Sequence, residues 1–213
     1  MQSLLRIIVS EEAETNGPEK IYLYEWLEHF LWQQGFPGLT IRRTEMNLDQ
    51  SSERHINILE DQAFNDLALI IETVSDSQQI AAVVPKIRRQ IAHGQVSVMK
   101  GMEQNDLQNH RYFSVKVYTK ENNTWFKKEE YEKVLNFFQS KNAFWTSVNK
   151  GIVGYGKDRV VHRQKMFSVS KQIPIVIECL ISSEKVNELT AGLKDVVEEG
   201  AVFATPVHLI VNE

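Results

Sequence analysis

One pattern occurs twice in this chain of 213 residues, at residues 67–94 (LALIIETVSDSQQIAAVVPKIRRQIAHG) and at residues 173–200 (IPIVIECLISSEKVNELTAGLKDVVEEG). Each copy begins with an apolar run, which is typical of a central β-strand. A helical period follows, and a glycine closes it, as a residue free to take positive φ does at a helix end. The shift of 106 residues between the copies indicates an internal duplication.

The flanking segments repeat in the same order. The first round predicts strands at 4–9 and 39–43 around a helix at 22–34, then a polar loop at 44–54 and a last strand at 95–99. The second round predicts strands at 113–119 and 145–149 around a helix at 127–141, then a loop at 150–165 and a last strand at 202–211. Each round therefore reads β-α-β-β-α-β. This order predicts an α+β fold of two tandem ferredoxin-like repeats, each an antiparallel sheet with both helices on one face.

The duplication also predicts the domain organisation. We expect a first repeat at residues 1–99, a linker at 100–111 and a second repeat at 112–213. A repeat of this size buries only a modest core, so we expect other copies of the chain to cover exposed sheet faces or edges. The protein is thus expected to be a homo-oligomer.

Composition excludes several classes of protein. The chain has 24 Lys and Arg against 28 Asp and Glu, a net charge of −4, which argues against a nucleic-acid partner. Its single cysteine, Cys179, excludes an internal disulfide framework and is expected to be a buried core residue. The longest apolar run is far shorter than the ~20 residues that span a bilayer, and residues 1–10 lack a signal-peptide cleavage site. We expect a soluble, cytoplasmic protein without membrane insertion.

The second long loop has the most distinctive chemistry. It combines three glycines with three cations: Lys150, Gly151, Gly154, Gly156, Lys157 and Arg159. Such a loop can bind an anion through uncovered backbone N–H groups. A phosphate-binding P-loop is disfavoured, because Asp158 stands where a Ser or Thr hydroxyl is needed and no helix pattern follows. The alternative is a glycine-rich hairpin tip with solvated charges.

The corresponding segment of the first repeat, residues 43–49, begins with Arg43 but has no glycine. Two histidines, His55 and His162, end the two loops at equivalent positions, either as ligand-site residues or as ordinary hydrogen-bonding groups. Glu72 and Glu178 are equivalent acids that either face clefts between chains or pair with a backbone donor or a neighbouring Arg. Asp76 and Gln79 resemble a capping box. No nucleophile–base pair, carboxylate pair or metal-ligand spacing is evident, so we expect neither an enzyme nor a bound metal or cofactor.

Two strings resemble a known family. Residues 35–40 (GFPGLT) and 145–156 (WTSVNKGIVGYG) resemble the core of the domain of unknown function 190 family, G-I-x-G-A-T-V-x-R-G-I-x-G-F-G. His162, the strand at 173–178 and Gly200 agree with it too. The resemblance covers nearly the whole chain as two tandem copies, and it is weaker in the first, which lacks the loop glycines.

That family resembles the PII-like signalling superfamily. The resemblance implies trimers that bind small effectors, often adenine nucleotides, in clefts between subunits. A long loop, the T-loop of PII proteins, then contacts a target such as a membrane transporter or an enzyme. We therefore expect a non-enzymatic regulator that binds a small anion with these residues: Lys150, Gly151, Gly154, Gly156, Lys157, Arg159, His162, Arg43 and His55. Two alternatives remain, a ligand-free scaffold protein and an enzyme with a site shared between subunits.

Overall fold

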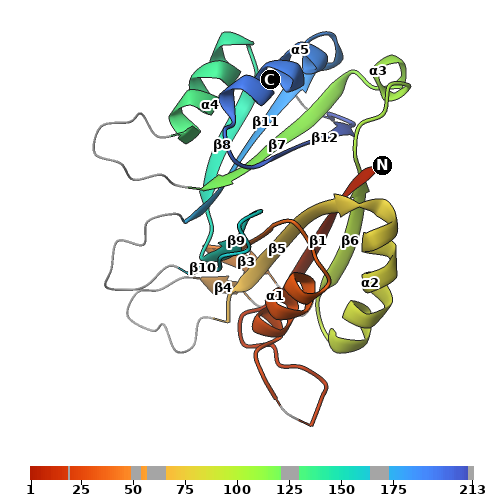
Figure 1. The fold of residues 1–213 in the computed structure, drawn as a ribbon, viewed down its shortest axis with the longest axis vertical. Coiled ribbons are helices and arrows are strands. Elements are labelled where there is room, and N and C mark those ends of the chain that lie inside the picture. Colours follow the sequence, from red (N-terminus) through yellow and green to blue (C-terminus); the bar gives the residue numbers. More distant parts are fainter. Residues whose placement is uncertain (19, 49–53, 57–65, 121–129, 164–172, 211–213) are drawn as a thin grey trace. The chain divides into compact units, whose positions relative to one another are not determined.

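The chain forms two compact units, Gln2–Met99 and Lys100–Glu213, in a computed structural model (Figure 1). The structure describes residues 1–18, 20–48, 54–56, 66–120, 130–163 and 173–210, except for the side chains of 46–48, 54–56 and 130. Each unit contains a four-stranded antiparallel arrangement with two long helices. The predicted pair of tandem α+β, ferredoxin-like repeats is confirmed.

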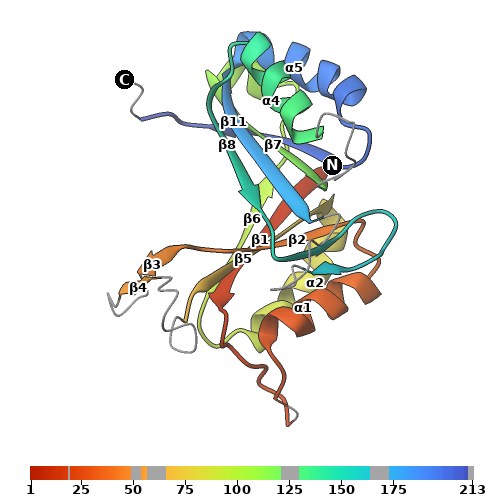
Figure 2. The same cartoon turned by 90° about the vertical axis from the view of Figure 1, so that its left-hand side faces the viewer.

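The N-terminal unit has the order predicted for it. Its main elements are β1 (Gln2–Ser10), α1 (Leu23–Gln33), β2 (Leu39–Arg43), β5 (Ala68–Asp76), α2 (Ser77–Gln90) and β6 (Gln95–Lys100). The strands lie in the order β2-β5-β1-β6, and β1 and β5 are antiparallel with Arg6 opposite Glu72. Figure 2 shows α1 and α2 on the same face of these strands.

The C-terminal unit repeats this architecture. Its main elements are β7 (Tyr112–Lys120), α4 (Glu130–Ser140), β8 (Phe144–Lys150), β11 (Pro174–Ser182), α5 (Ser183–Val196) and β12 (Ala201–Val207). The strand order β12-β7-β11-β8 matches that of the first unit, and Lys116 lies opposite Glu178 as Arg6 lies opposite Glu72. The antiparallel registers confirm the correspondence of the two repeats.

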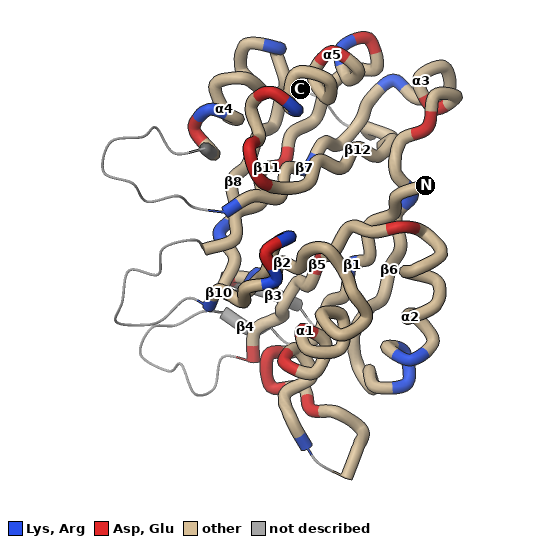
Figure 3. Tube along the Cα trace, viewed as in Figure 1, with Lys and Arg blue, Asp and Glu red and all other residues tan. Residues whose placement is uncertain are grey.

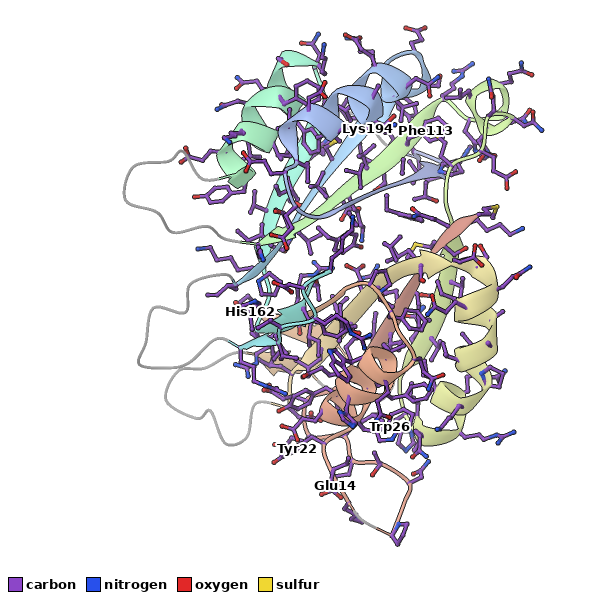
Figure 4. The ribbon with its side chains drawn as sticks, in the orientation of Figure 1. Glu14, Tyr22, Trp26, Phe113, His162 and Lys194 are labelled. Atoms are coloured by element: carbon purple, nitrogen blue, oxygen red, sulfur yellow. The ribbon has the colours of Figure 1, made fainter. Side chains whose placement is uncertain are left out.

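Alternate residues of the central strands make the core of the C-terminal unit. Side chains of β7 and β11 point to the face that α4 and α5 cover, and the core residues there are fully buried: Phe113, Val115, Val117, Val134, Phe138, Ile175, Ile177, Cys179, Ile181, Val186, Leu189 and Leu193. Phe113 is labelled in Figure 4. The period of two on the strands and of 3.6 on the helices therefore directs one apolar face of each element inward.

Two glycines allow a close approach in equivalent places. A Cβ atom at Gly94 would lie 2.5 Å from the carbonyl oxygen of Ile8, and one at Gly200 would lie 2.1 Å from that of Tyr118. Both distances are far inside van der Waals contact. The prediction that these glycines close the second helix of each repeat is wrong: α2 ends at Gln90 and α5 at Val196, and each glycine stands just before the last strand, where the neighbouring carbonyl leaves no room for a side chain.

The structure corrects three local predictions. The loop at 44–54 begins with β3 (Met46–Leu48), which pairs with β4 (Arg54–Ile56), and the loop at 150–165 contains β9 (Val153–Tyr155) paired with β10 (His162–Arg163). The predicted linker contains a short helix, α3 (Asp106–Asn109). Elements of two to four residues are too short to show a hydrophobic period, which is why the sequence pattern missed them.

The capping box is formed only in part. The Asp76 carboxylate accepts a 2.8 Å hydrogen bond from the Gln78 N–H at the start of α2. The Gln79 side chain instead accepts a hydrogen bond from Ser75 Oγ with its oxygen and donates one from its amide nitrogen to the carbonyl of Gln34 at 2.9 Å. Gln79 therefore connects the start of α2 to the end of α1, a contact that local sequence does not reveal.

Candidate functional site

The segment that follows β8 is anchored at its start by its backbone. The Gly151 N–H donates a 2.7 Å hydrogen bond to the carbonyl of Pro174 in β11. Farther on, β9 and β10 pair with Gly154 opposite His162. Between them, the Arg159 N–H donates to the Gly156 carbonyl at 2.9 Å, and Arg159 takes a positive φ of 57°. The glycine-rich segment is therefore a short hairpin with a defined turn.

An ionic cluster holds this turn against the rest of the C-terminal unit. Lys120, the last residue of β7, places its Nζ 3.0 Å from Asp158 Oδ2 and 2.9 Å from Glu199 Oε1. The other Asp158 oxygen, Oδ1, accepts the Val160 N–H at 3.1 Å. His162 Nε2 lies 4.0 Å from Asp158 Oδ2. One lysine thus joins the turn to the segment that follows α5.

The ion pairs shift the titration of their members. Burial alone would lower the pKa of Lys120, but its hydrogen bonds to Glu199 and Asp158 raise that pKa above its ordinary 10.5. Burial alone would raise the pKa of Asp158, but the Val160 N–H and the Lys120 ammonium group together lower it below 3.8. Both groups are therefore charged throughout the neutral range.

A hollow of ≈ 350 Å³ opens beside this cluster in the C-terminal unit. Its lining combines two lysines, two acids and the end of α5: Lys157, Leu193, Lys194, Val197, Glu198, Glu199, Gly200 and Val202. Lys194 and His162 are labelled in Figure 4, and Figure 3 shows residues of both charge signs along α5. Lys157 is exposed and comes from the glycine-rich segment, so the hollow and the segment share a cation.

The structure brings some of the predicted residues together. Gly156 lies within the cluster, since a Cβ at that position would be 3.8 Å from both Asp158 Oδ1 and Glu199 Oε1. Lys157 and Arg159 are the neighbours of Asp158 in the turn between β9 and β10, His162 begins β10, and Lys150 lies apart at the end of β8. The Gly151 N–H is already donated to Pro174 and is therefore occupied in this structure.

The first-repeat candidates lie in the N-terminal unit. Arg43 ends β2 and forms an ion pair with Glu11, and both side chains are partly exposed. His55 lies in β4 opposite Asn47, and its side chain is outside the described residues. Ser10, opposite Ala68, corresponds in register to Lys120, opposite Pro174. The first repeat therefore has no lysine at the position that organises the cluster.

Sequence reasoning missed two members of this site, Lys120 and Glu199. Neither lies in the glycine-rich segment, and each has an unremarkable local sequence. Only the pairing of β7 with β11 and the turn before β12 bring them to Asp158. A cluster built from three separate segments has no local motif to recognise.

Two further features concern metal binding and membrane-spanning helices. Within the described ranges, no group of three or more His, Cys, Asp and Glu side chains is arranged to hold a metal ion. None of the helices in the described part of the chain is long and apolar enough to span a membrane.

The chain is similar to two curated proteins, each matched over less than half of this chain's own length, and to one solved structure. A UPF0166 protein of Methanocaldococcus jannaschii is 27% identical over 100 residues, which cover 46% of this chain and 92% of that relative. A UPF0166 protein of Aquifex aeolicus is 24% identical over 80 residues, 38% of this chain and 76% of the relative. A crystal structure of an unknown protein from Galdieria sulphuraria covers 97% of this chain and 98% of its own, at 10% identity and a TM-score of 0.31.

The family match accounts for both repeats. The family described as "Uncharacterized ACR, COG1993" (DUF190) matches residues 2–101 and again residues 112–209. The two matches coincide with the two β-α-β-β-α-β rounds. This chain is a member of the DUF190 family and carries two tandem copies of its domain.

Proposed function

We propose that this protein is a PII-like regulator that binds a small anionic effector with residues 150–163 and the adjoining hollow. An adenine nucleotide is the first class of effector to test. The observation that carries the proposal is the position of Lys157. This residue belongs to the glycine-rich turn and lines the hollow together with Lys194. Two ammonium groups at one concave surface provide charge-assisted donors for phosphate oxygens.

The glycine-rich turn adds to this chemistry. Gly156 is partly exposed and has no side chain to keep an oxyanion from the backbone, whereas Gly154 is buried in β9. Lys150 and Arg159 belong to the same short segment and supply further positive charge, and His162 adds a ring nitrogen as a hydrogen-bonding group. Because Asp158 fixes the turn to Lys120, the segment presents these groups in one arrangement.

The titration of the cluster favours binding over catalysis. A general acid or base works best when its pKa lies near the operating pH. The pKa of Asp158 is lowered and that of Lys120 is raised, so both are shifted away from neutrality. We propose a non-enzymatic role in which effector binding controls a partner protein, such as a transporter.

The proposal includes a homotrimer. Two small repeats leave sheet edges that further copies of the chain can cover. Native mass spectrometry of the full chain, with and without ATP, is expected to give three chains per particle. A monomer or dimer under both conditions would exclude the trimer.

Titration calorimetry tests the effector. ATP, ADP, AMP, cyclic AMP and pyrophosphate are each titrated into the full chain. At least one is expected to bind, and Lys157→Ala is expected to weaken that binding roughly ten- to a hundredfold, since a hydrogen bond to a charged group contributes ~1.5–3 kcal/mol. Lys20→Ala is the matched control, because Lys20 is exposed in the N-terminal unit and pairs with Glu14.

Each negative outcome has a definite meaning. If none of these anions binds, the effector proposal is wrong and a ligand-free scaffold is the better description. If Lys157→Ala and Lys20→Ala bind equally well, the effector lies elsewhere. Turnover of ATP that disappears in Lys157→Ala would show an enzyme instead.

A further inference from the structure

The ammonium group of Lys120 has two carboxylates as partners. Its Nζ lies 2.9 Å from Glu199 Oε1 and 3.0 Å from Asp158 Oδ2. One positive and two negative charges leave this contact with a net charge of −1. Lys120 therefore keeps one carboxylate partner, Asp158, when another anion takes the place of Glu199.

Glu199 is the more accessible of the two carboxylates. Its side chain is 41% exposed, compared with 34% for Asp158 and 16% for Lys120. Glu199 also lines the hollow, whereas Asp158 is fixed by the Val160 N–H. An anion in the hollow thus meets Glu199, and the Glu199 carboxylate in turn contacts Lys120.

We infer that Lys120 is an effector-binding residue. In the absence of effector, the Glu199 carboxylate occupies the position on Lys120 that a phosphate oxygen of the effector takes. This inference rests on the proposed function and adds a residue and a regulatory step to the same site. A phosphate oxygen of the effector replaces Glu199 Oε1 on Lys120 Nζ. Glu199 can then turn toward water, because its side chain is already 41% exposed and the phosphate oxygen replaces it on Lys120.

The exchange also explains how the effector changes the protein. Lys120 holds Asp158, and Asp158 holds the turn of the glycine-rich segment. An effector that draws Lys120 toward the hollow weakens its contact with Asp158. By linkage, a partner that binds better to the form without the Lys120–Asp158 contact then strengthens effector binding.

Glu199→Gln tests this exchange. The substitution keeps the size of the side chain and removes its charge. Binding of pyrophosphate and ATP, measured by titration calorimetry, is expected to become about tenfold tighter, because the carboxylate that competes for Lys120 is gone. A tenfold change corresponds to ~1.4 kcal/mol of binding free energy. Adding Lys120→Met to this variant is expected to abolish the gain.

Glu198→Gln is the matched control. Glu198 also lines the hollow, but its carboxylate pairs with Lys133 at 3.1 Å. Both variants remove one negative charge from the hollow, and only Glu199→Gln frees Lys120. Asp158→Asn is a second variant. Its side chain keeps an acceptor for the Val160 N–H but loses the negative charge that pairs with Lys120.

The outcomes separate this inference from the proposed function. If the unmodified chain binds an anion and Glu199→Gln gains no more affinity than Glu198→Gln, the exchange at Lys120 is wrong and the proposed effector site stands. If Glu199→Gln alone binds, the exchange is supported. If no form of the chain binds either probe, both the proposed function and the exchange are overturned.

Discussion

Arg42 donates a 2.8 Å hydrogen bond from Nη2 to Glu72 Oε2, and the Glu72 side chain has no exposed surface. Arg6 lies opposite Glu72 in the β1–β5 pair, with its Nε 3.8 Å from the other carboxylate oxygen. The equivalent acid of the second repeat, Glu178, contacts Lys116 and Ser114 and is 35% exposed. Of the two interpretations of these acids, pairing with a neighbouring arginine describes Glu72.

Replacing Arg42 is expected to destabilise the N-terminal unit. Arg42→Ala removes the hydrogen bond from a buried carboxylate, which costs about 2–3 kcal/mol in the free energy of unfolding. Urea denaturation followed by the fluorescence of Trp26 and Trp32 measures the change. Arg43→Ala is the control, because its pair with Glu11 is partly exposed on both sides and is expected to cost far less. Equal losses in the two variants would contradict a special role for Glu72.

Alanine is expected to be poorly tolerated at Gly94 and Gly200. The added Cβ would meet the carbonyl oxygen of Ile8 or Tyr118 at 2.5 or 2.1 Å, so the backbone has to shift. Thermal unfolding followed by circular dichroism is expected to show a clearly lower Tm for both variants. At Gly156 the nearest atoms to an added Cβ are 3.8 Å away, so Gly156→Ala is expected to leave the Tm nearly unchanged. A Tm loss in Gly156→Ala as large as in Gly200→Ala would refute the steric argument.

The thiol of Cys179 is expected to be unreactive in the folded protein. Burial, with a smaller effect from the Glu178 carboxylate, raises the pKa of Cys179 from 9.0 to about 12. Since the thiolate is the reactive form, a thiol reagent at pH 8 is expected to label Cys179 only after unfolding. Rapid labelling of the native protein would contradict this burial.

The same shift makes stability depend on pH. Above pH 9 the unfolded chain loses the Cys179 proton while the folded chain keeps it. The folded state therefore binds more protons between pH 9 and about 12, and the free energy of unfolding falls across this range. Comparing urea denaturation of Cys179→Ala with that of the unmodified chain at several pH values isolates this contribution. A contribution from Cys179 that did not decline with rising pH would count against the raised pKa.

The N-cap Asp76 of α2 is expected to contribute more to stability than Ser182, the N-cap of α5. The Gln78 N–H is the main cause of the lowered pKa of Asp76, and Asp76→Ala removes this acceptor from the start of α2. The Tm is expected to fall by a few degrees. Ser182 occupies the equivalent position before α5 without a side-chain cap, so Ser182→Ala is expected to have little effect on Tm.

Sequence patterns predicted the long elements and missed the short ones. The predicted strand at 39–43 has the same first and last residue as β2, because apolar and β-branched residues mark it. Where the pairs β3–β4 and β9–β10 form, the sequence pattern predicts only loops, because strands of two or three residues show no period. Likewise, the N-cap at Asp76 follows from local sequence, whereas the contact from Gln79 to Gln34 joins two helices and depends on their packing.

The sequence by itself determined the duplication, the β-α-β-β-α-β order of each repeat and the family, because period, spacing and motif are properties of neighbouring residues. The tertiary structure alone decided which charges meet. Lys120, Asp158 and Glu199 come from three segments, and antiparallel pairing places them within hydrogen-bond distance. The sequence shows which charges the protein has, but the folded backbone sets the distances between them, and the energy of an ion pair depends on distance and burial.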